Sequence, residues 1–273
     1  MALEDHAGDV VNKARRMKGI DTATVARVAG MTETELEAFA DAGGFATEPD
    51  WRALGTLLDL DAGKLERVAK GWLPAAPDLA AWRHFRQITT VGPSMDVHAY
   101  LVWDDATRDA AIFDTGFDPA PIFAIVEREG LHPRCLFITH MHGDHVAGLE
   151  AIRAKYPEIR LRTNAASAPA RCRNDREEVI AIGTLQVANR DTPGHAPDGV
   201  TYVITGFPDG APAVAIVGDA IFAGSMGGAP TAGDLARRKV SEQILTLPED
   251  TLIGPGHGPL TTVGQERANN PFF

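Results

Sequence analysis

The chain has 273 residues, of which 44% are hydrophobic, and a formal net charge of −11 at pH 7. This length predicts one large or two unequal domains with a sizeable core, and the acidic balance argues against nucleic acid or an anionic membrane as a bulk partner. No apolar run approaches the roughly 18 residues of a membrane-spanning helix. The first residues lack the features of a signal peptide, and two cysteines are too few for a disulfide framework, so we expect a cytoplasmic protein without a membrane partner.

The first 73 residues have helical periodicity and little strand signal, up to a break at Pro74-Ala-Ala-Pro77. Residues 22–39 have the spacing of a helix-turn-helix, with Gly30 where the turn needs positive φ. Thr32 and Glu35 form a capping box that opens the second helix. Further helices are expected at 51–60 and 65–73. This segment resembles the five-helix repressor-like domain of the Cro and xenobiotic-response-element regulators.

The charge of the second helix argues against DNA reading. Residues 32–42 contain no Lys or Arg and four acidic residues, namely Glu33, Glu35, Glu37 and Asp41. A helix in the major groove lies among phosphates, which would repel these carboxylates. Residues 1–72 hold nine Lys/Arg against thirteen Asp/Glu, a net charge of −4, whereas DNA binding needs the opposite sign. We therefore expect a packing, lid or homodimerisation role for this domain, although a basic cluster on the first helix (Lys13, Arg15, Arg16, Lys18) leaves DNA binding open.

After a linker at 74–81, strand and helix signals alternate. Strands are expected at 97–103, 110–113, 134–139, 213–217 and 251–253, and helices at 119–129 and 146–156. The pattern predicts an α/β domain over residues 82–273 with two strand-rich halves and interleaved helices.

A cluster of ligand-type side chains follows the strand at 134–139. Within six positions stand His140, His142, Asp144 and His145. Imidazole and carboxylate are ligands of zinc, iron and manganese. A helix would spread these positions around its circumference, so we expect a strand-to-helix loop that directs them to one point. Three further residues come just past later strands, beside glycines that allow close backbone approach: His195, Asp219 and His257.

The order H-x-H-x-D-H, then His, Asp and His, resembles the metallo-β-lactamase superfamily over residues 82–273. The resemblance implies an αββα sandwich with a dinuclear metal centre. One ion would be held by His140, His142 and His195, and the other by Asp144, His145 and His257. Asp219 would bridge both, and Asp114, in Phe113-Asp-Thr-Gly116, would fix the metal loop by hydrogen bonds. Two divalent ions are implied, with zinc expected and iron or manganese as alternatives.

Such a centre generates a nucleophile at neutral pH. Two cations lower the pKa of a bridging water towards 7 and polarise a carbonyl oxygen, so the expected reaction is hydrolysis by a metal-bridging hydroxide. Asp144 is the catalytic candidate that orients the hydroxide and accepts its proton. Substrate contacts are expected from His98, Phe222 and Met226.

Two segments, Gly218–Met226 and Gly256–Phe272, resemble the glyoxalase II (hydroxyacylglutathione hydrolase) branch. The resemblance favours thioester hydrolysis of a small-molecule substrate. The chain departs from that branch at Gly228, where relatives often carry arginine. Only 16 residues follow His257, too few for the helical domain that holds glutathione in full glyoxalase II, so a smaller or different thioester is expected.

Three alternatives remain open. Persulfide dioxygenation would use a single iron held by His140, His195 and Asp219, a two-His-one-carboxylate set. Lactone hydrolysis fits less well, because the homoserine-lactonases place a tyrosine where Phe222 stands. A non-enzymatic regulator would use the metal domain as a sensor and the N-terminal domain as a DNA-binding output.

Overall fold

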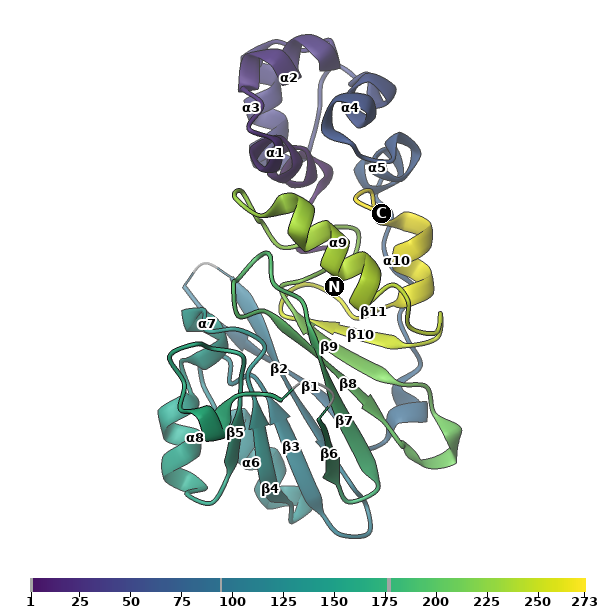
Figure 1. The fold of residues 1–273 in the computed structure, drawn as a ribbon. Coiled ribbons are helices and arrows are strands. Elements are labelled where there is room, and N and C mark those ends of the chain that lie inside the picture. The colour runs from purple at the N-terminus through teal and green to yellow at the C-terminus, as the bar shows by residue number, and fades with distance from the viewer. Residues whose placement is uncertain (1, 94, 176–177) are drawn as a thin grey trace.

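In the computed structural model of the chain, which describes residues 2–93, 95–175 and 178–273, a helical region precedes two packed β-sheets (Figure 1). The helical region consists of α1 (Ala7–Lys18), α2 (Thr22–Ala29), α3 (Glu33–Ala42), α4 (Trp51–Leu58) and α5 (Ala62–Ala69). Among the described residues, no helix is both long enough and apolar enough to cross a membrane.

Local capping sets the ends of these helices. The predicted capping box is confirmed, because Thr32 Oγ1 accepts from the Glu35 amide while Glu35 accepts from the Thr32 amide. Gly30 ends α2 with a φ of 73°. The helix expected at 51–60 stops at Leu58 because Asp59 adopts a left-handed conformation. The helix expected at 65–73 lies earlier in the chain, since the Asp61 side chain caps it.

The first sheet has the strand order β1-β2-β3-β4-β5. The first three strands pair antiparallel, and β3, β4 and β5 pair parallel. The two parallel connections contain α6 (Ala120–Glu129) and then α7 (Gly143–Val146) with α8 (Leu149–Lys155). The strands are β1 (Phe85–Val91), β2 (Asp96–Trp103), β3 (Asp109–Phe113), β4 (His132–Phe137) and β5 (Arg160–Arg162).

The second sheet has the order β11-β10-β9-β8-β7-β6, in which only β9 and β10 pair parallel. Two α-helices follow strands of this sheet, namely α9 (Gly233–Gln243) after β9 and α10 (Val263–Asn269) after β11. Its strands are β6 (Val179–Ile182), β7 (Leu185–Asp191), β8 (Val200–Thr205), β9 (Val214–Gly218), β10 (Leu252–Pro255) and β11 (Thr261–Thr262). Short 3₁₀ turns are formed by Leu79–Trp82, Ala170–Cys172 and Pro208–Gly210.

The sheets face each other across one apolar layer, and helices cover the outer faces. Side chains of alternate residues divide between these layers, as the two-residue period of a strand requires: on β2, Tyr100 joins the inter-sheet cluster and Leu101 joins the cluster beneath α6 and α8. Val240 of α9 and Val263 of α10 pack on the other outer face. The predicted αββα sandwich is confirmed.

The helical region packs on the sandwich at the side of α9 and α10 (Figure 1). Its core continues into the sandwich, because four residues from beyond position 220 share its apolar cluster: Met226, Ala229, Ala236 and Phe272. Division of the chain into independent units at 1–73 and 82–273 stays a prediction.

Candidate metal centre

The ligand-type side chains meet where four strands end. His140 follows β4, His195 follows β7, Asp219 follows β9 and His257 follows β10. A backbone hydrogen bond from Gly256 to Gly218 (2.8 Å) joins the last two of these strand ends. The loop expected before a helix is therefore present. The single helix expected at 146–156 is wrong, because the chain breaks at Gly148, whose amide donates to Thr115 Oγ1 and which packs against Pro119.

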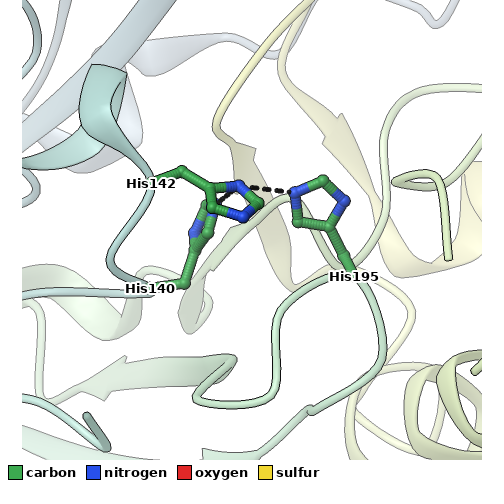
Figure 2. A group of neighbouring side chains, drawn as sticks. All are labelled: His140, His142 and His195. Atoms are coloured by element: carbon green, nitrogen blue, oxygen red, sulfur yellow. Dashed lines mark hydrogen bonds between the residues drawn. The ribbon is translucent and has the colours of Figure 1, made fainter. Parts of the chain in front are cut away.

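Three imidazole rings converge at the first group (Figure 2). His142 Nδ1 lies 3.0 Å from His140 Nε2 and 3.0 Å from His195 Nε2. Nitrogen ligands of a tetrahedral ion at bond lengths of 2.0–2.1 Å would be roughly 3.3 Å apart. The three nitrogens are thus spaced for a shared ion.

A second group lies beside the first. Asp144 Oδ2 is 3.3 Å from His257 Nε2 and 3.5 Å from His145 Nε2. These three ligand atoms lie close enough together to hold one ion. His145 and His257 are buried, whereas Asp144 is partly exposed.

Asp219 stands between the groups. Its Oδ1 lies 3.3 Å from His145 Nε2, and its Oδ2 lies 3.3 Å from His195 Nε2 and 3.5 Å from His257 Nε2. The carboxylate of Asp219 thus contacts histidines of both groups, and its Oδ2 alone lies beside one histidine of each. The structure brings all seven residues singled out as ligands together in one place.

The outer nitrogens of three rings are fixed by oxygen atoms. His145 Nδ1 contacts Asp114 Oδ2 at 2.8 Å, His195 Nδ1 contacts the Gly228 carbonyl at 3.0 Å, and His257 Nδ1 contacts the Asp96 carbonyl at 2.6 Å. An Nδ1–H donated to oxygen leaves the Nε2 lone pair free and directed inward, as in metal-ligating histidines.

Asp114 holds the metal loop as well as the His145 ring. It accepts from both the amide and the hydroxyl of Thr139, each at 2.7 Å. The residue is buried and has a φ of 55°, a costly conformation for a non-glycine residue. Two carboxylate oxygens thereby fix the start of the loop and one of its histidines.

The charges of the clustered side chains are suited to binding cations. Burial lowers the pKa of His140 to about 3, so this ring is neutral. Burial also opposes charge on His145 and His257, but neighbouring carboxylates outweigh it and raise their pKa values to about 10 and about 11. Without metal, protons on these two rings compensate the carboxylates. A bound cation would displace such protons.

Within this cluster of described residues, two buried side-chain atoms have no hydrogen-bond partner, namely His145 Nε2 and Asp219 Oδ1. Buried polar atoms are normally satisfied. Both point into the cluster, and an ion held there would satisfy both. The residues present therefore fit a metal.

Two glycines allow the backbone to pass close to Asp219 at the centre. A Cβ at position 256 would lie 2.2 Å from Asp219 Oδ1, and one at position 227 would lie 2.0 Å from the Asp219 carbonyl. Either side chain would displace Asp219, which explains why glycine stands at both positions.

The three expected substrate contacts are buried, and this corrects the sequence interpretation. His98 engages both ring nitrogens, with Thr89 Oγ1 at 3.0 Å and the Gly258 carbonyl at 2.8 Å. Met226 is fully buried in the apolar cluster of the helical region. Phe222 is 3% exposed and packs its ring 5.8 Å from that of His257. His98 and Phe222 thus pack beside His257 or its neighbour Gly258, whereas the Met226 side chain packs in the core of the helical region.

Sequence reasoning missed what holds the turn after Asp219. Glu266 accepts from the Gly224 amide at 2.9 Å, and Asn270 donates to the Ser225 carbonyl at 2.7 Å. Both residues belong to the C-terminal segment whose motif suggested glyoxalase II, so the signal was present without a physical reason. The Gly228 and Asp96 carbonyls gave no signal, because any residue has one.

Comparison with known proteins agrees with this geometry. The profile of the family described as "Metallo-beta-lactamase superfamily" matches residues 93–162. A relative named "Probable metallo-hydrolase YqgX" from Bacillus subtilis is 29% identical, over 67% of this chain and 94% of its own. "Hydroxyacylglutathione hydrolase GloC" from Haemophilus influenzae is 28% identical, over 63% and 91%. The human "Persulfide dioxygenase ETHE1, mitochondrial" is 30% identical, over 63% and 69%.

Solved structures share the fold. BLEG-1, described as a B3 metallo-β-lactamase, superposes with a TM-score of 0.59 at 30% identity, covering 69% of this chain and 98% of that one. TTHA1623, solved in a di-iron-bound form, has a TM-score of 0.54 at 26% identity, covering 69% and 100%. Coverage near 69% leaves the remaining part of the chain outside each match.

Proposed function

The chain belongs to the metallo-β-lactamase superfamily, and we propose that it is a dinuclear metal-dependent hydrolase of a small thioester. The observation that carries this proposal is the position of Asp219 between two complete groups of ligand atoms. A single bound ion would occupy one of these groups of ligand atoms and leave the other empty. The di-iron form of TTHA1623 supports a two-ion centre in this fold.

His140, His142 and His195 would hold one ion, and Asp144, His145 and His257 the other, with Asp219 shared. The carboxylates of Asp114, Asp144 and Asp219 would offset three of the four positive charges of two divalent ions. Zinc fits imidazole-rich sites, and iron or manganese fits the same donors. Two such ions would activate water at neutral pH and polarise a carbonyl.

The chain's own residues would orient the reaction. The Asp144 carboxylate is partly exposed, and a hydrogen bond from His257 lowers its pKa to about 2. Ionised at neutral pH, it would orient the attacking water and accept its proton. Asp114, Gly228 and Asp96 would keep the rings in place through the contacts described above. When the acyl C–S bond of a thioester breaks, the sulfur leaves as a thiolate, which needs protonation less than an alkoxide or amine leaving group does.

Support for a thioester comes from relatives. GloC is named as a hydroxyacylglutathione hydrolase, and this chain covers 91% of it. The turn after Asp219 and the helix that holds it through Glu266 and Asn270 come from the two segments that resemble that branch.

A second candidate, persulfide dioxygenase, is favoured by the human ETHE1 match and by the proximity of His140, His195 and Asp219. Elemental analysis of protein purified without added metal separates the two, followed by assays on thioester, lactone and persulfide panels. Two ions per chain with thioester turnover support the hydrolase. One iron per chain, together with oxygen uptake on a persulfide, would instead support the dioxygenase and contradict the hydrolase proposal.

A further inference from the structure

The loop formed by residues 222–228 lies between Asp219 and α9 and touches two rings of the metal centre. Its Gly228 carbonyl contacts His195 Nδ1 at 3.0 Å. Its Phe222 ring packs against the His257 ring. Movement of this loop would therefore reorient ligands on both sides of Asp219.

The helical region reaches this loop through α1. Lys13 Nζ donates to the Met226 carbonyl at 3.1 Å and lies 5.0 Å from the centre of the Phe222 ring. The Asp5 carboxylate accepts from Ser225 Oγ at 2.6 Å and from Lys13 Nζ at 2.5 Å. The Asp5–Lys13 ion pair thus contacts the loop at three positions, namely Phe222, Ser225 and Met226.

This ion pair is not a solvated surface contact. The side chain of Asp5 is 8% exposed, that of Lys13 is 23% exposed, and Ser225 is fully buried. Charge-assisted hydrogen bonds at such depth are stronger than neutral ones and are weakly screened. On the opposite side, Glu266 and Asn270 hold the same loop from the sandwich.

We infer that Lys13, paired with Asp5, is a positioning residue of the metal centre: the helical region holds the 222–228 loop against His195 and His257 and so fixes the direction of their Nε2 atoms. This inference rests on the proposed function, because it gives the positioned rings a metal to bind. It assigns the N-terminal helices a part in the hydrolytic unit, through a contact that spans 213 positions in sequence.

The test uses the full chain with four variants. Lys13→Met removes the charge, Lys13→Arg restores a donor, and Lys13→Met with Asp5→Asn removes both charges so that no buried carboxylate is left unpaired. The matched control is Arg16→Met, which alters an exposed cation on the same helix. Thermal unfolding verifies that each variant folds.

Two readouts are measured. In chelator-treated protein, amide hydrogen exchange of residues 222–228 should be at least about tenfold faster in Lys13→Met and in the double variant than in wild type. In Co²⁺-loaded protein, competition with a chelator should show about a tenfold loss of affinity for each ion, with a changed visible spectrum, since distant support of ligands typically acts at this scale. Lys13→Arg should recover most of both effects, and Arg16→Met should match wild type.

Folded Lys13→Met and double variants with wild-type loop exchange and Co²⁺ affinity would overturn the inference while leaving the proposed function intact. A wild-type protein that binds no Co²⁺ would refute the proposed function, and the positioning role with it.

Discussion

Asp114 and His145 lie 31 positions apart in sequence, and their side chains meet at 2.8 Å inside the protein, Oδ2 against Nδ1. Both are almost completely buried. The carboxylate therefore sets the tautomer of a ring whose other nitrogen faces the proposed metal.

Asp114→Asn should weaken metal binding at the Asp144–His145–His257 group by about 10–100-fold. The amide nitrogen of asparagine cannot accept from His145 and Thr139 as the carboxylate does, so the ring loses its fixed direction. Chelator competition measures the affinity of each ion. Asp105→Asn, at an exposed position in the turn between β2 and β3, is the control. Equal affinities in the two variants would remove this role from Asp114.

Ligand substitutions should divide the centre. His142→Ala should cost one ion and His145→Ala the other, whereas Asp219→Ala should reduce the content of both, because this carboxylate faces both groups. Elemental analysis of purified variants gives the stoichiometry. His132→Ala, at an exposed position on β4, should keep the wild-type content. Well-folded wild-type protein without metal would contradict the two-ion centre itself.

Asp144→Asn should lower kcat far more than it raises KM for a thioester substrate. An orienting and proton-accepting carboxylate acts in the transition state, so its loss leaves substrate binding nearly unchanged; a fall of roughly 10²–10⁴-fold is expected. Glu150→Gln, an exposed carboxylate on α8, is the control. A change confined to KM would assign Asp144 to binding alone.

The cluster of ligand-type side chains could be predicted because its signal is local. Histidines and aspartates just past several strand ends indicated a shared site, and the family resemblance implied how they group around Asp219. The supporting contacts could not be predicted in this way. Lys13 contacts Met226 only because the helical region packs over the 222–228 loop, and that packing buries the Met226 side chain, which we expected to contact substrate.

An α/β domain with two strand-rich halves was likewise predictable from the alternation of strands and helices, and the family resemblance implied the αββα sandwich, whereas breaks within elements depended on tertiary contacts. The sequence of residues 146–156 does not indicate that the Gly148 amide donates to Thr115 Oγ1 and that the helix is divided there. Phe222 likewise shows what sequence does not reveal. Its identity indicated that a hydroxyl is missing, but it did not indicate that the ring is buried against Lys13.

Glu266→Gln should change how stability depends on pH. Burial raises the pKa of Glu266 to about 7, outweighing the hydrogen bonds from Asn270, Thr261 and Gly224 and the charge of Lys64. The folded state thus keeps a proton that the unfolded state, with an ordinary pKa of 4.5, releases. The stability from this group is fully present below pH 4.5 and is lost as pH rises through 7.

The difference in unfolding free energy, wild type minus Glu266→Gln, should therefore decrease from pH 4.5 to 7, by roughly 3 kcal/mol at about 1.4 kcal/mol per pH unit. Denaturant unfolding of chelator-treated protein measures it, which removes any contribution from metal binding. Glu249→Gln, at an exposed carboxylate near α10, should show no such slope. A difference that grows with pH would mean that the hydrogen bonds outweigh burial and keep Glu266 ionised.

The helical region should not bind DNA. The exposed face of α3 carries acidic residues one turn apart, at Glu33, Glu37 and Asp41. Arg15 and Arg16 of α1, which left DNA binding open, line one groove with Glu37 and Asp41, so these carboxylates lower the positive potential that phosphates would meet.

Fluorescence anisotropy with duplex DNA should give no binding by the wild-type chain at near-physiological salt. Replacing Glu33, Glu37 and Asp41 by Lys should create weak binding that falls steeply between about 50 and 200 mM salt, as counterion release requires. Tight, salt-sensitive binding of the wild-type chain to one defined duplex would instead make the metal domain the sensor of a regulator.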